Sequence, residues 1–277
     1  MSWTVFDLEV SDHIAHIRLN RPEKLNSFTP ALWRELPAAV RQIDEQATAR
    51  VIVISSSGKH FTAGMDLSVF SSFESDDAIE TARANAAFMQ LIKSLQETFS
   101  ALAKARLPVI AAVQGGCIGA GLDLVTACDL RYASADAFFS LHEINIGMVA
   151  DVGTFPRLQK LVPSAIAREM AFTGDPLTAS RAEQVGLLNG VFDDHEALLE
   201  GAMATAKKIA AKSPMAIWGS KALLNYGEDH SIADTLEHIA TWQAGMFSYT
   251  DIKTALVAQQ EKQLATFEAL AGKKVLK

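Results

Sequence analysis

The sequence is poor in cysteine, in basic charge and in long apolar runs, and each shortage excludes a class of protein. It contains only 2 cysteines, Cys117 and Cys128, too few for a disulfide framework or a cysteine-rich zinc site. No run of about 18 apolar residues occurs, so we expect no membrane-spanning helix. With 25 Lys and Arg against 32 Asp and Glu, the net charge is −7, which argues against nucleic-acid binding.

The two ends of the sequence also lack the usual targeting patterns. The first ten residues carry acids at Asp7 and Glu9 instead of a basic start and an apolar run, so we expect no signal peptide. The final residues, 275–277, do not spell a peroxisomal address. Because both cysteines stand in apolar surroundings and are expected to be free core residues, we predict a reducing, cytoplasmic location.

What is present indicates a soluble α/β protein. A chain of 277 residues with 49% hydrophobic and 21% charged residues forms one large domain, or one domain with a smaller appendage. Apolar runs such as VIVIS at 51–55 predict strands that are buried on both faces, and helical periodicity separates them. The predicted elements are a hairpin over 4–20 with its turn at Ser11-Asp12, strands over 51–55, 108–113, 129–134 and 137–141, and helices over 30–46, over 78–104 and from 122.

Strand signals nearly vanish after about residue 163, which predicts a helical C-terminal part. We divide the chain into a core over 1–200 and a helical region over 201–277. Such helices cover either their own core or other subunits, and the pattern alone allows both. The predicted helices are 163–172, 178–186, 195–212, 214–225, 231–248 and 251–270.

Two glycine-containing segments follow predicted strands. In His60–Leu67, Gly64 allows the backbone to approach a ligand closely, and the amide of Met65 could then point into a pocket. In Gly115–Asp123, free amides at a helix start favour developing negative charge. An ordinary loop is the alternative for the first segment. A dinucleotide site is disfavoured for the second, because its glycine spacing is not G-x-G-x-x-G.

Three carboxylates complete the candidate chemistry. Asp123 stands in the first turn of a predicted helix, Glu143 follows a strand, and Asp151 lies in an otherwise uncharged run. Each has a structural alternative when it is taken singly: a charge at a helix N-terminus, a surface acid, and a helix cap, respectively.

Taken together, these segments resemble the crotonase (enoyl-CoA hydratase/isomerase) superfamily. The resemblance rests on FTAGMDL, on GCIGAGLDLVTACDLRY and on the segment from Phe138 to Leu158, and it extends to the N-terminal HIRLNRPEKLNS. It implies an α/β fold of repeated ββα units wound into a spiral. It also implies that the C-terminal helices build trimers, often paired as hexamers.

The acids point to one subfamily. Hydratases of the superfamily carry glutamates at the positions of Asp123 and Glu143 and glycine at Asp151. Asp–Glu–Asp at these three positions, the last of them within IGMVADVGT, resembles Δ3,5-Δ2,4-dienoyl-CoA isomerase instead. The resemblance implies conversion of a 3,5-dienoyl-CoA to the 2,4-isomer, with Glu143 acting at C2, Asp151 at C6, and Asp123 setting the protonation of the pair or orienting a partner.

The same resemblance assigns the binding residues. The amides of Met65 and Ala120 are expected to form the oxyanion hole. No metal or redox cofactor is expected, because this chemistry requires none, and coenzyme A is part of the substrate. Residues between Val69 and Phe88 are expected to set the acyl-chain preference. The residues expected along the acyl-CoA are Lys24, Leu25, Ala63, Gly64, Met65, Asp66, Leu67 and Ala120.

Two other functions stay open at this level. Hydration of a 2-enoyl-CoA, or Δ3-Δ2 isomerisation, is the alternative within the superfamily. An inactive relative that serves as a binding or assembly protein, for RNA among other partners, is the alternative from another class. The three intact acids and the acidic charge balance disfavour the second alternative, and filter binding at physiological salt tests it.

Overall fold

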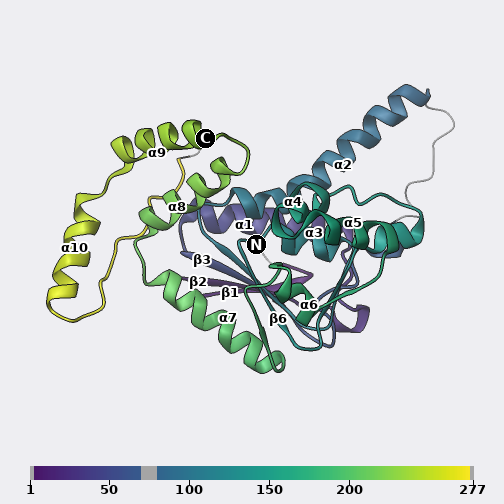
Figure 1. Ribbon diagram of the computed structural model, residues 1–277, viewed down its shortest axis with the longest axis horizontal. Coiled ribbons are helices and arrows are strands. Elements are labelled where there is room, and N and C mark those ends of the chain that lie inside the picture. The colour runs from purple at the N-terminus through teal and green to yellow at the C-terminus, as the bar shows by residue number, and fades with distance from the viewer. Residues whose placement is uncertain (1–2, 70–79, 275–277) are drawn as a thin grey trace.

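The computed structural model of the chain describes residues 3–69 and 80–274 and centres on a twisted sheet (Figure 1). All neighbouring strands in this sheet are parallel except the first pair. The predicted α/β class is therefore confirmed. In spatial order the strands are β1 (Phe6–Ser11), β2 (Ile14–Leu19), β3 (Val51–Ser56), β4 (Val109–Val113), β6 (Leu130–Ser134) and β9 (Gly190–Phe192).

The predicted hairpin is present, but its turn lies one residue later than expected. Ser11 pairs with Ile14 and therefore still belongs to the ladder. The turn is formed by Asp12 and His13, whose φ angles of 49° and 63° are both positive. Two positive φ angles produce the mirror-image turns that suit the twist of a two-residue hairpin, and aspartate tolerates this region well.

Helices cover both faces of the sheet, with α7 opposite α1 and α2 (Figure 1). Every residue of β3 is buried, and successive side chains enter different clusters. Val53 packs with Ala202 and Ala206 of α7, whereas Ile54 belongs to the larger core. This is why the strand reads as a continuous apolar run. The helix bounds are α1 (Pro30–Gln46), α2 (Thr81–Lys104) and α7 (His195–Ala210).

A second, smaller sheet carries the segments that later form the candidate site. Its strands are too short for periodicity to distinguish them from loops, so the sequence predicts only one of them. Its central strand, Phe138–Ser140, pairs with one neighbour in parallel and with the other antiparallel. The elements here are β5 (Gly116–Ile118), α3 (Ala120–Thr126), β7 (Phe138–Ser140), η3 (His142–Ile146), α4 (Thr154–Leu161) and β8 (Leu177–Thr178).

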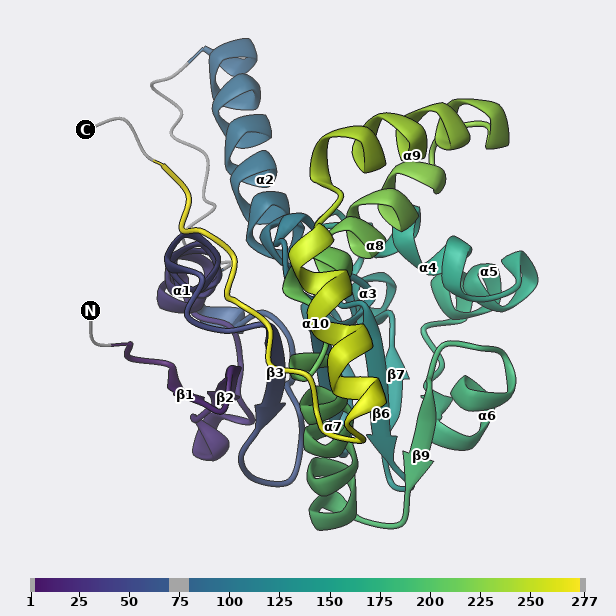
Figure 2. The ribbon, with the colours of Figure 1, turned by 90° about the vertical axis from the view of Figure 1, so that its left-hand side faces the viewer.

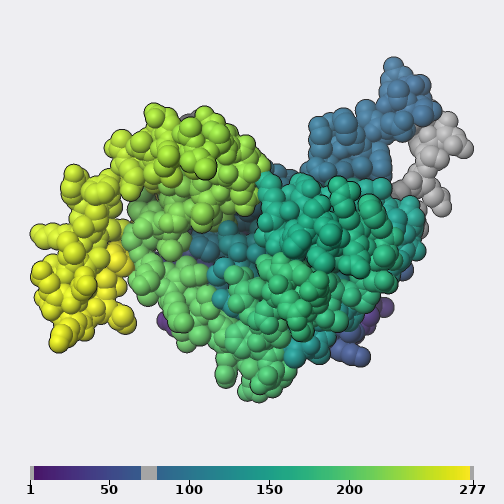
Figure 3. All heavy atoms as spheres, in the orientation of Figure 1, coloured from purple at the N-terminus to yellow at the C-terminus, as the bar shows by residue number. Residues whose placement is uncertain are grey.

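The N-terminal half of α2 is largely exposed. Phe88 and Leu91 recur at helical spacing, but they are 48% and 38% exposed. The buried residues of α2 begin only at Thr98, and the first turns project from the body (Figure 3). Helical periodicity identifies an apolar face without naming what that face contacts. Residues 78 and 79 of the predicted helix lie outside the described part of the chain.

The last three helices, α8 (Pro214–Gly227), α9 (Ile232–Met246) and α10 (Tyr249–Gln260), form an arm that leaves the body beside the sheet (Figures 1 and 2). The six predicted helices are present, but the predicted strand-poor region also contains β8 and β9. The division at residue 200 stays a prediction, and that residue lies within α7. Among the described residues, no helix is long and apolar enough to cross a membrane. The remaining bounds are α5 (Ser164–Thr173) and α6 (Ala179–Gln184).

The last predicted helix, over 251–270, is too long, because α10 ends at Gln260. The chain then returns to the body as an extended tail (Figure 2). Arg50 Nη2 donates to the Phe267 carbonyl at 2.6 Å, and Arg106 Nη1 donates to the Ala271 carbonyl at 3.1 Å. These tertiary hydrogen bonds hold the tail against the body, so here long-range contacts outweigh the local helix propensity.

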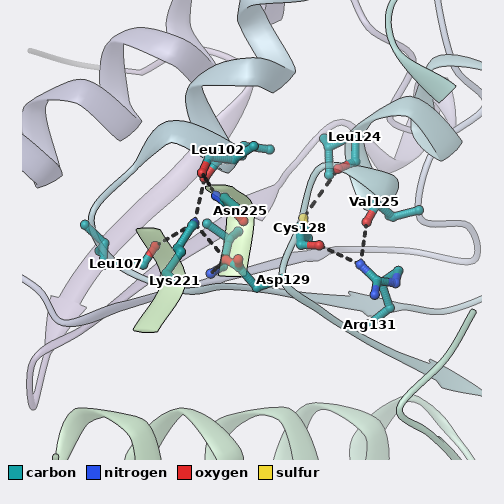
Figure 4. Close-up of polar contacts among 11 residues, drawn as sticks. Leu102, Leu107, Leu124, Val125, Cys128, Asp129, Arg131, Lys221 and Asn225 are labelled. Carbon is teal, nitrogen blue, oxygen red and sulfur yellow. Dashed lines mark hydrogen bonds and ion pairs between the residues drawn. The ribbon is translucent and has the colours of Figure 1, made fainter. Parts of the chain in front are cut away.

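A buried ion pair attaches the arm to the core (Figure 4). Lys221 of α8 is 6% exposed, and its ammonium donates to Asp129 Oδ2 at 2.8 Å. The same nitrogen donates to the carbonyls of Leu102 at 2.9 Å and Leu107 at 3.0 Å. All three ammonium donors therefore have acceptors. We call this group of four residues the lysine anchor.

Candidate active site

Segments from both sheets surround a cavity of about 490 Å³. The wall combines apolar side chains with two carboxylates, Glu143 and Asp151, and with backbone of two glycine-containing segments. Such a mixture is typical of small-molecule sites. The lining residues are Ser27, Ala63, Gly64, Met65, Asp66, Leu67, Ile118, Gly119, Ala120, His142, Glu143, Ile146, Met148, Asp151 and Val152.

Three predicted site residues do not line this cavity. Lys24, the last residue of η1 (Pro22–Lys24), is exposed, and Leu25 is 47% exposed. Leu25 nevertheless supports the wall, because its carbonyl accepts a hydrogen bond from Ala63 N at 2.9 Å. The third, Asp123, is fully buried behind the wall. The segment expected to set chain preference, between Val69 and Phe88, falls largely on residues 70–79, outside the described part of the chain.

Two backbone amides on the cavity wall have no acceptor among the described residues. Phe28 N donates to Gly64 O at 2.7 Å, and Asp66 N donates to Phe28 O at 3.1 Å, so this bridge bypasses the amide of Met65. Ala120 is the first residue of α3, where an amide has no partner within the helix. Both amides are therefore available to an oxygen atom of a bound molecule.

Gly64 allows the two amides to lie close together. Its φ is +83°, a conformation that favours glycine. A Cβ at this position would lie 2.6 Å from Ile118 O and 3.4 Å from Ala120 N. The loop after β3 therefore packs directly against the segment that leads into α3, and any side chain here would push the two apart.

Glu143 occupies the first turn of η3, beside Gly119. Its Oε2 is buried and has no hydrogen-bond partner among the described residues. Burial, with a further contribution from Asp123, raises the pKa of Glu143 to about 7. A carboxyl with this pKa gains and loses a proton near neutral pH, as a general acid or base requires.

Asp123 is fully buried, and its two oxygens differ. Oδ1 accepts hydrogen bonds from Thr154 N at 2.5 Å and from Thr154 Oγ1 at 2.7 Å. Oδ2 has no partner in the described part of the chain. Burial raises the pKa of Asp123 to about 6, although the Thr154 hydrogen bonds oppose this effect. Asp123 thus binds the first amide of α4 while remaining titratable.

Asp151 lies in the loop before α4, three residues from Thr154. Burial raises its pKa above the ordinary value. Gln96 Nε2 in α2 donates to the Asp151 carbonyl at 2.7 Å, which fixes the backbone of this loop. The cap position of α4 is occupied by Gly153, so the alternative of Asp151 as a helix cap does not apply. We call Asp123, Glu143 and Asp151 the acid cluster.

Several wall residues were not identified from the sequence. Ser27 Oγ donates to Asp66 Oδ2 at 2.9 Å and so ties two wall segments together. Gly119, Met148 and Val152 also line the cavity. All four residues lie within the segments that carry the family resemblance, so the motifs themselves could have named them. Their side chains carry no chemical signal that would have done so.

Comparison with known proteins shows which family and which relatives the chain resembles. The family model described as enoyl-CoA hydratase/isomerase matches residues 9–270. The chain is 41% identical over 263 residues to the mitochondrial Delta(3,5)-Delta(2,4)-dienoyl-CoA isomerase of Pongo abelii, covering 93% of this chain and 80% of that protein. It is 38% identical to the peroxisomal Delta(3,5)-Delta(2,4)-dienoyl-CoA isomerase of Arabidopsis thaliana, over 93% of each chain.

The fold agrees with this placement. The crystal structure of a putative enoyl-CoA hydratase from Streptomyces coelicolor superposes with a TM-score of 0.87 at 25% identity, covering 96% of this chain and 95% of that one. The protein therefore belongs to the enoyl-CoA hydratase/isomerase family, and the predicted crotonase-like fold is confirmed.

The predicted cytoplasmic location is wrong by the same comparison. The relatives at 41% and 38% identity are named as mitochondrial and peroxisomal proteins. A targeting address is a short segment read by a receptor, and it can differ between proteins that share one folded core. Composition and free cysteines of the core therefore did not determine location.

Proposed function

We propose that this protein isomerises a 3,5-dienoyl-CoA to the conjugated 2,4-dienoyl-CoA. The observation that carries the proposal is that Glu143 and Asp151 share one cavity wall with two backbone amides that have no acceptor among the described residues, while Asp123 lies buried behind that wall. The names of the relatives at 38–41% identity support the same reaction. A catalyst for this reaction needs a base near C2, an acid near C6 and donors for the thioester oxygen.

The amides of Met65 and Ala120 are the proposed donors. Loss of a proton from C2 transfers negative charge to the thioester oxygen, and two fixed N–H groups stabilise that charge as it develops. Because neither amide has an acceptor among the described residues, no existing hydrogen bond must break first. The wall from Ala63 to Leu67 is proposed to run along the coenzyme A moiety.

Glu143 and Asp151 are the proposed proton-transfer pair. Glu143 removes a proton from C2, and the electron pair of that C–H bond forms the C2–C3 double bond. The C3–C4 double bond shifts to C4–C5, and the C5–C6 pair takes a proton from Asp151 at C6. One proton is removed and one is added, so the reaction needs no oxidant, and we propose that it needs no metal or other cofactor.

The experiment is ultraviolet spectroscopy with two substrates. Purified protein is mixed with a 3,5-dienoyl-CoA and, separately, with a 2-enoyl-CoA. Absorbance from the 2,4-dienoyl thioester should rise in the first reaction, and the 2-enoyl signal should persist in the second. Rapid loss of the 2-enoyl signal without diene formation would instead make the protein a hydratase. Dialysis against EDTA should leave the isomerisation rate unchanged.

We also propose that the helical region over 201–277 assembles the protein into a trimer or hexamer. No residue of α9 or α10 is buried within the chain. Leu236, Tyr249 and Leu256 are 60%, 79% and 55% exposed, and apolar surface of this kind usually contacts another chain. Sedimentation equilibrium should give a mass three or six times 29.9 kDa. A monomer at micromolar concentration would contradict the proposal.

A further inference from the structure

One partly buried charge near the acid cluster has no place in the mechanism above. Arg157 lies in the second turn of α4, and its Nη2 donates to the Ser100 hydroxyl of α2 at 3.1 Å. Its Nη1 is buried and has no hydrogen-bond partner in the described part of the chain. None of the ion pairs between described residues includes Arg157. Removing part of an unpaired cation from water is costly, so a compensating role is expected.

The fold makes room for this guanidinium at the start of α4. Gly153, the cap residue, has φ of +132°, a conformation that favours glycine. A Cβ at Gly153 would lie only 2.0 Å from Arg157 Nη1 and 3.1 Å from Cζ. The guanidinium therefore fills the space that a side chain at position 153 would occupy. This position is two residues after Asp151.

Asp123 contacts the same helix start from another element. Its Oδ1 accepts from Thr154, and its Oδ2 is a buried acceptor that has no partner among residues 3–69 and 80–274. The start of α4 thus brings together an unpaired anion, from α3, and an unpaired cation, Arg157. They do not form a direct ion pair, so their interaction acts through space in a poorly solvated region.

We propose that Arg157 is a positioning residue that acts through Asp123: it keeps this carboxyl ionised, and the charge on Asp123 in turn makes Glu143 a stronger base. The inference rests on the proposed isomerase function and deepens it. Arg157 touches neither the cavity nor the substrate path, since it is absent from the wall. It sets the pH range in which the acid cluster works.

The electrostatics of each group support this order of action. Burial raises the pKa of Asp123, and the Arg157 charge is among the groups that lower it. Burial also raises the pKa of Glu143, and Asp123 is the next cause in the same direction. Burial lowers the pKa of Arg157, and Asp123 is the largest opposing cause. The coupling from Arg157 to Glu143 therefore passes through Asp123.

Few other charges face these two groups. The α2 residues at this contact, Gln96 and Ser100, are neutral. Glu228, at the end of α8, is exposed and pairs with Lys160 at 3.7 Å. The titratable groups that change the pKa of Arg157 are Asp123, Cys128 and Glu228. The charges that change the pKa of Asp123 are those of Asp151 and Arg157. The Asp123 charge in turn raises the pKa of Glu143 and of Cys117.

The test is the pH profile of kcat/KM for Arg157→Gln. Without the cation, Asp123 keeps its proton to higher pH and no longer raises the pKa of Glu143. Glu143 should then ionise at lower pH, so the acidic limb should move down by about one pH unit while KM at high pH stays constant. Arg157→Lys retains the charge and should restore most of the wild-type profile. Arg168→Gln, at an exposed arginine in α5 that contacts Ser164, is the matched control and should change nothing.

A double-mutant cycle then locates the effect. In an Asp123→Asn background, Arg157→Gln should no longer move the acidic limb, because the group through which it acts is gone. An equal shift with and without Asp123 would overturn the inference. So would an unchanged profile for Arg157→Gln, or a lysine variant that shifts as far as the glutamine variant, because these results indicate a purely structural arginine.

Two further measurements keep the outcomes distinct. Wild-type protein that forms no diene would overturn the proposed function, whereas an active wild type with an unshifted Arg157→Gln profile would overturn this inference alone. If Arg157→Gln does not fold, Ser100→Ala replaces it, because this change removes the hydrogen bond that holds the guanidinium. A smaller shift in the same direction is then expected, and no shift contradicts the inference.

Discussion

The lysine anchor and the acid cluster are both groups of buried charge, and they differ in how well their polar atoms are bonded. Lys221 donates to three acceptors, and its partner Asp129 Oδ2 also accepts from Val109 N at 2.7 Å. In the acid cluster, Asp123 Oδ2 and Glu143 Oε2 have no partner in the described part of the chain. A saturated group fixes geometry, whereas an unsaturated group retains the capacity to bind substrate and move protons.

The largest predicted effect is a loss of catalysis without a loss of stability, and it concerns the acid cluster. Asp151→Asn should lower kcat about 10³–10⁴-fold, since the amide cannot deliver a proton to C6. Thioester binding and thermal stability should stay close to wild type, because the Asp151 contact with Gln96 uses only backbone carbonyl. Stopped-flow absorbance gives kcat, and calorimetric titration with a saturated acyl-CoA gives the affinity.

The control for this variant is Asp175→Asn, at an exposed carboxylate outside the cavity wall, which should retain full activity. A loss of thioester affinity as large as the loss of kcat in Asp151→Asn would remove the acid role and leave Asp151 as a binding residue.

Gly119→Ala should have the next largest effect, because it disturbs both halves of the chemistry. Gly119 precedes the proposed donor Ala120 and has φ of +53°. An added Cβ would lie 3.2 Å from Glu143 Oε1. Displacing the amide and the base together should lower kcat about 10²–10³-fold. Gly245→Ala in α9, where a Cβ meets nothing within 4 Å, should leave kcat unchanged. Similar rates for both variants would contradict the proposed geometry.

Lys221→Met should show the opposite pattern, with lost stability and retained chemistry. Removing one partner of a buried ion pair typically costs about 3 kcal/mol of unfolding free energy. Urea unfolding measures this loss, and kcat of the folded fraction should stay within about twofold of wild type. Lys104→Met, which breaks the exposed pair with Glu97, should cost less than about 1 kcal/mol. A lysine-anchor variant as stable as wild type would show that the arm does not depend on this contact.

Long, strongly periodic elements could be predicted from the sequence. Helix α1 occupies the predicted range of 30–46, and β3 extends the predicted strand by one residue. The predictions failed where tertiary contacts decide. The tail after Gln260 is extended because Arg50 and Arg106 bind its carbonyls, and these partners lie more than 160 residues away in the chain.

The candidate site was predictable in part for a related reason. Asp123, Glu143 and Asp151 could be named because acids in apolar runs are conspicuous, and a family resemblance grouped them. The sequence could not show that Asp123 stays behind the wall and binds Thr154. Arg157 carried no signal at all, since one arginine in an amphipathic helix reads as a surface residue. Its position depends on Gly153 and Ser100, which come from different elements.

The smallest expected effect is a dependence of stability on pH, and it tests the unsaturated state of Asp123 directly. Burial raises the pKa of Asp123 from the ordinary value of 3.8 to about 6, so the folded state holds this proton more tightly than the unfolded chain does. The resulting stability is complete below pH 4 and disappears as the pH rises through 6, a change of at most about 3 kcal/mol. Asp123→Asn stays neutral at every pH and can still accept from Thr154 N, so its unfolding free energy should vary less between pH 4 and 6.

Urea unfolding at pH 4, 5, 6 and 7 measures both slopes. Equal pH slopes for wild type and Asp123→Asn would mean that Asp123 is stably ionised in the folded protein. The contrast between the acid cluster and the lysine anchor would then rest on Glu143 alone.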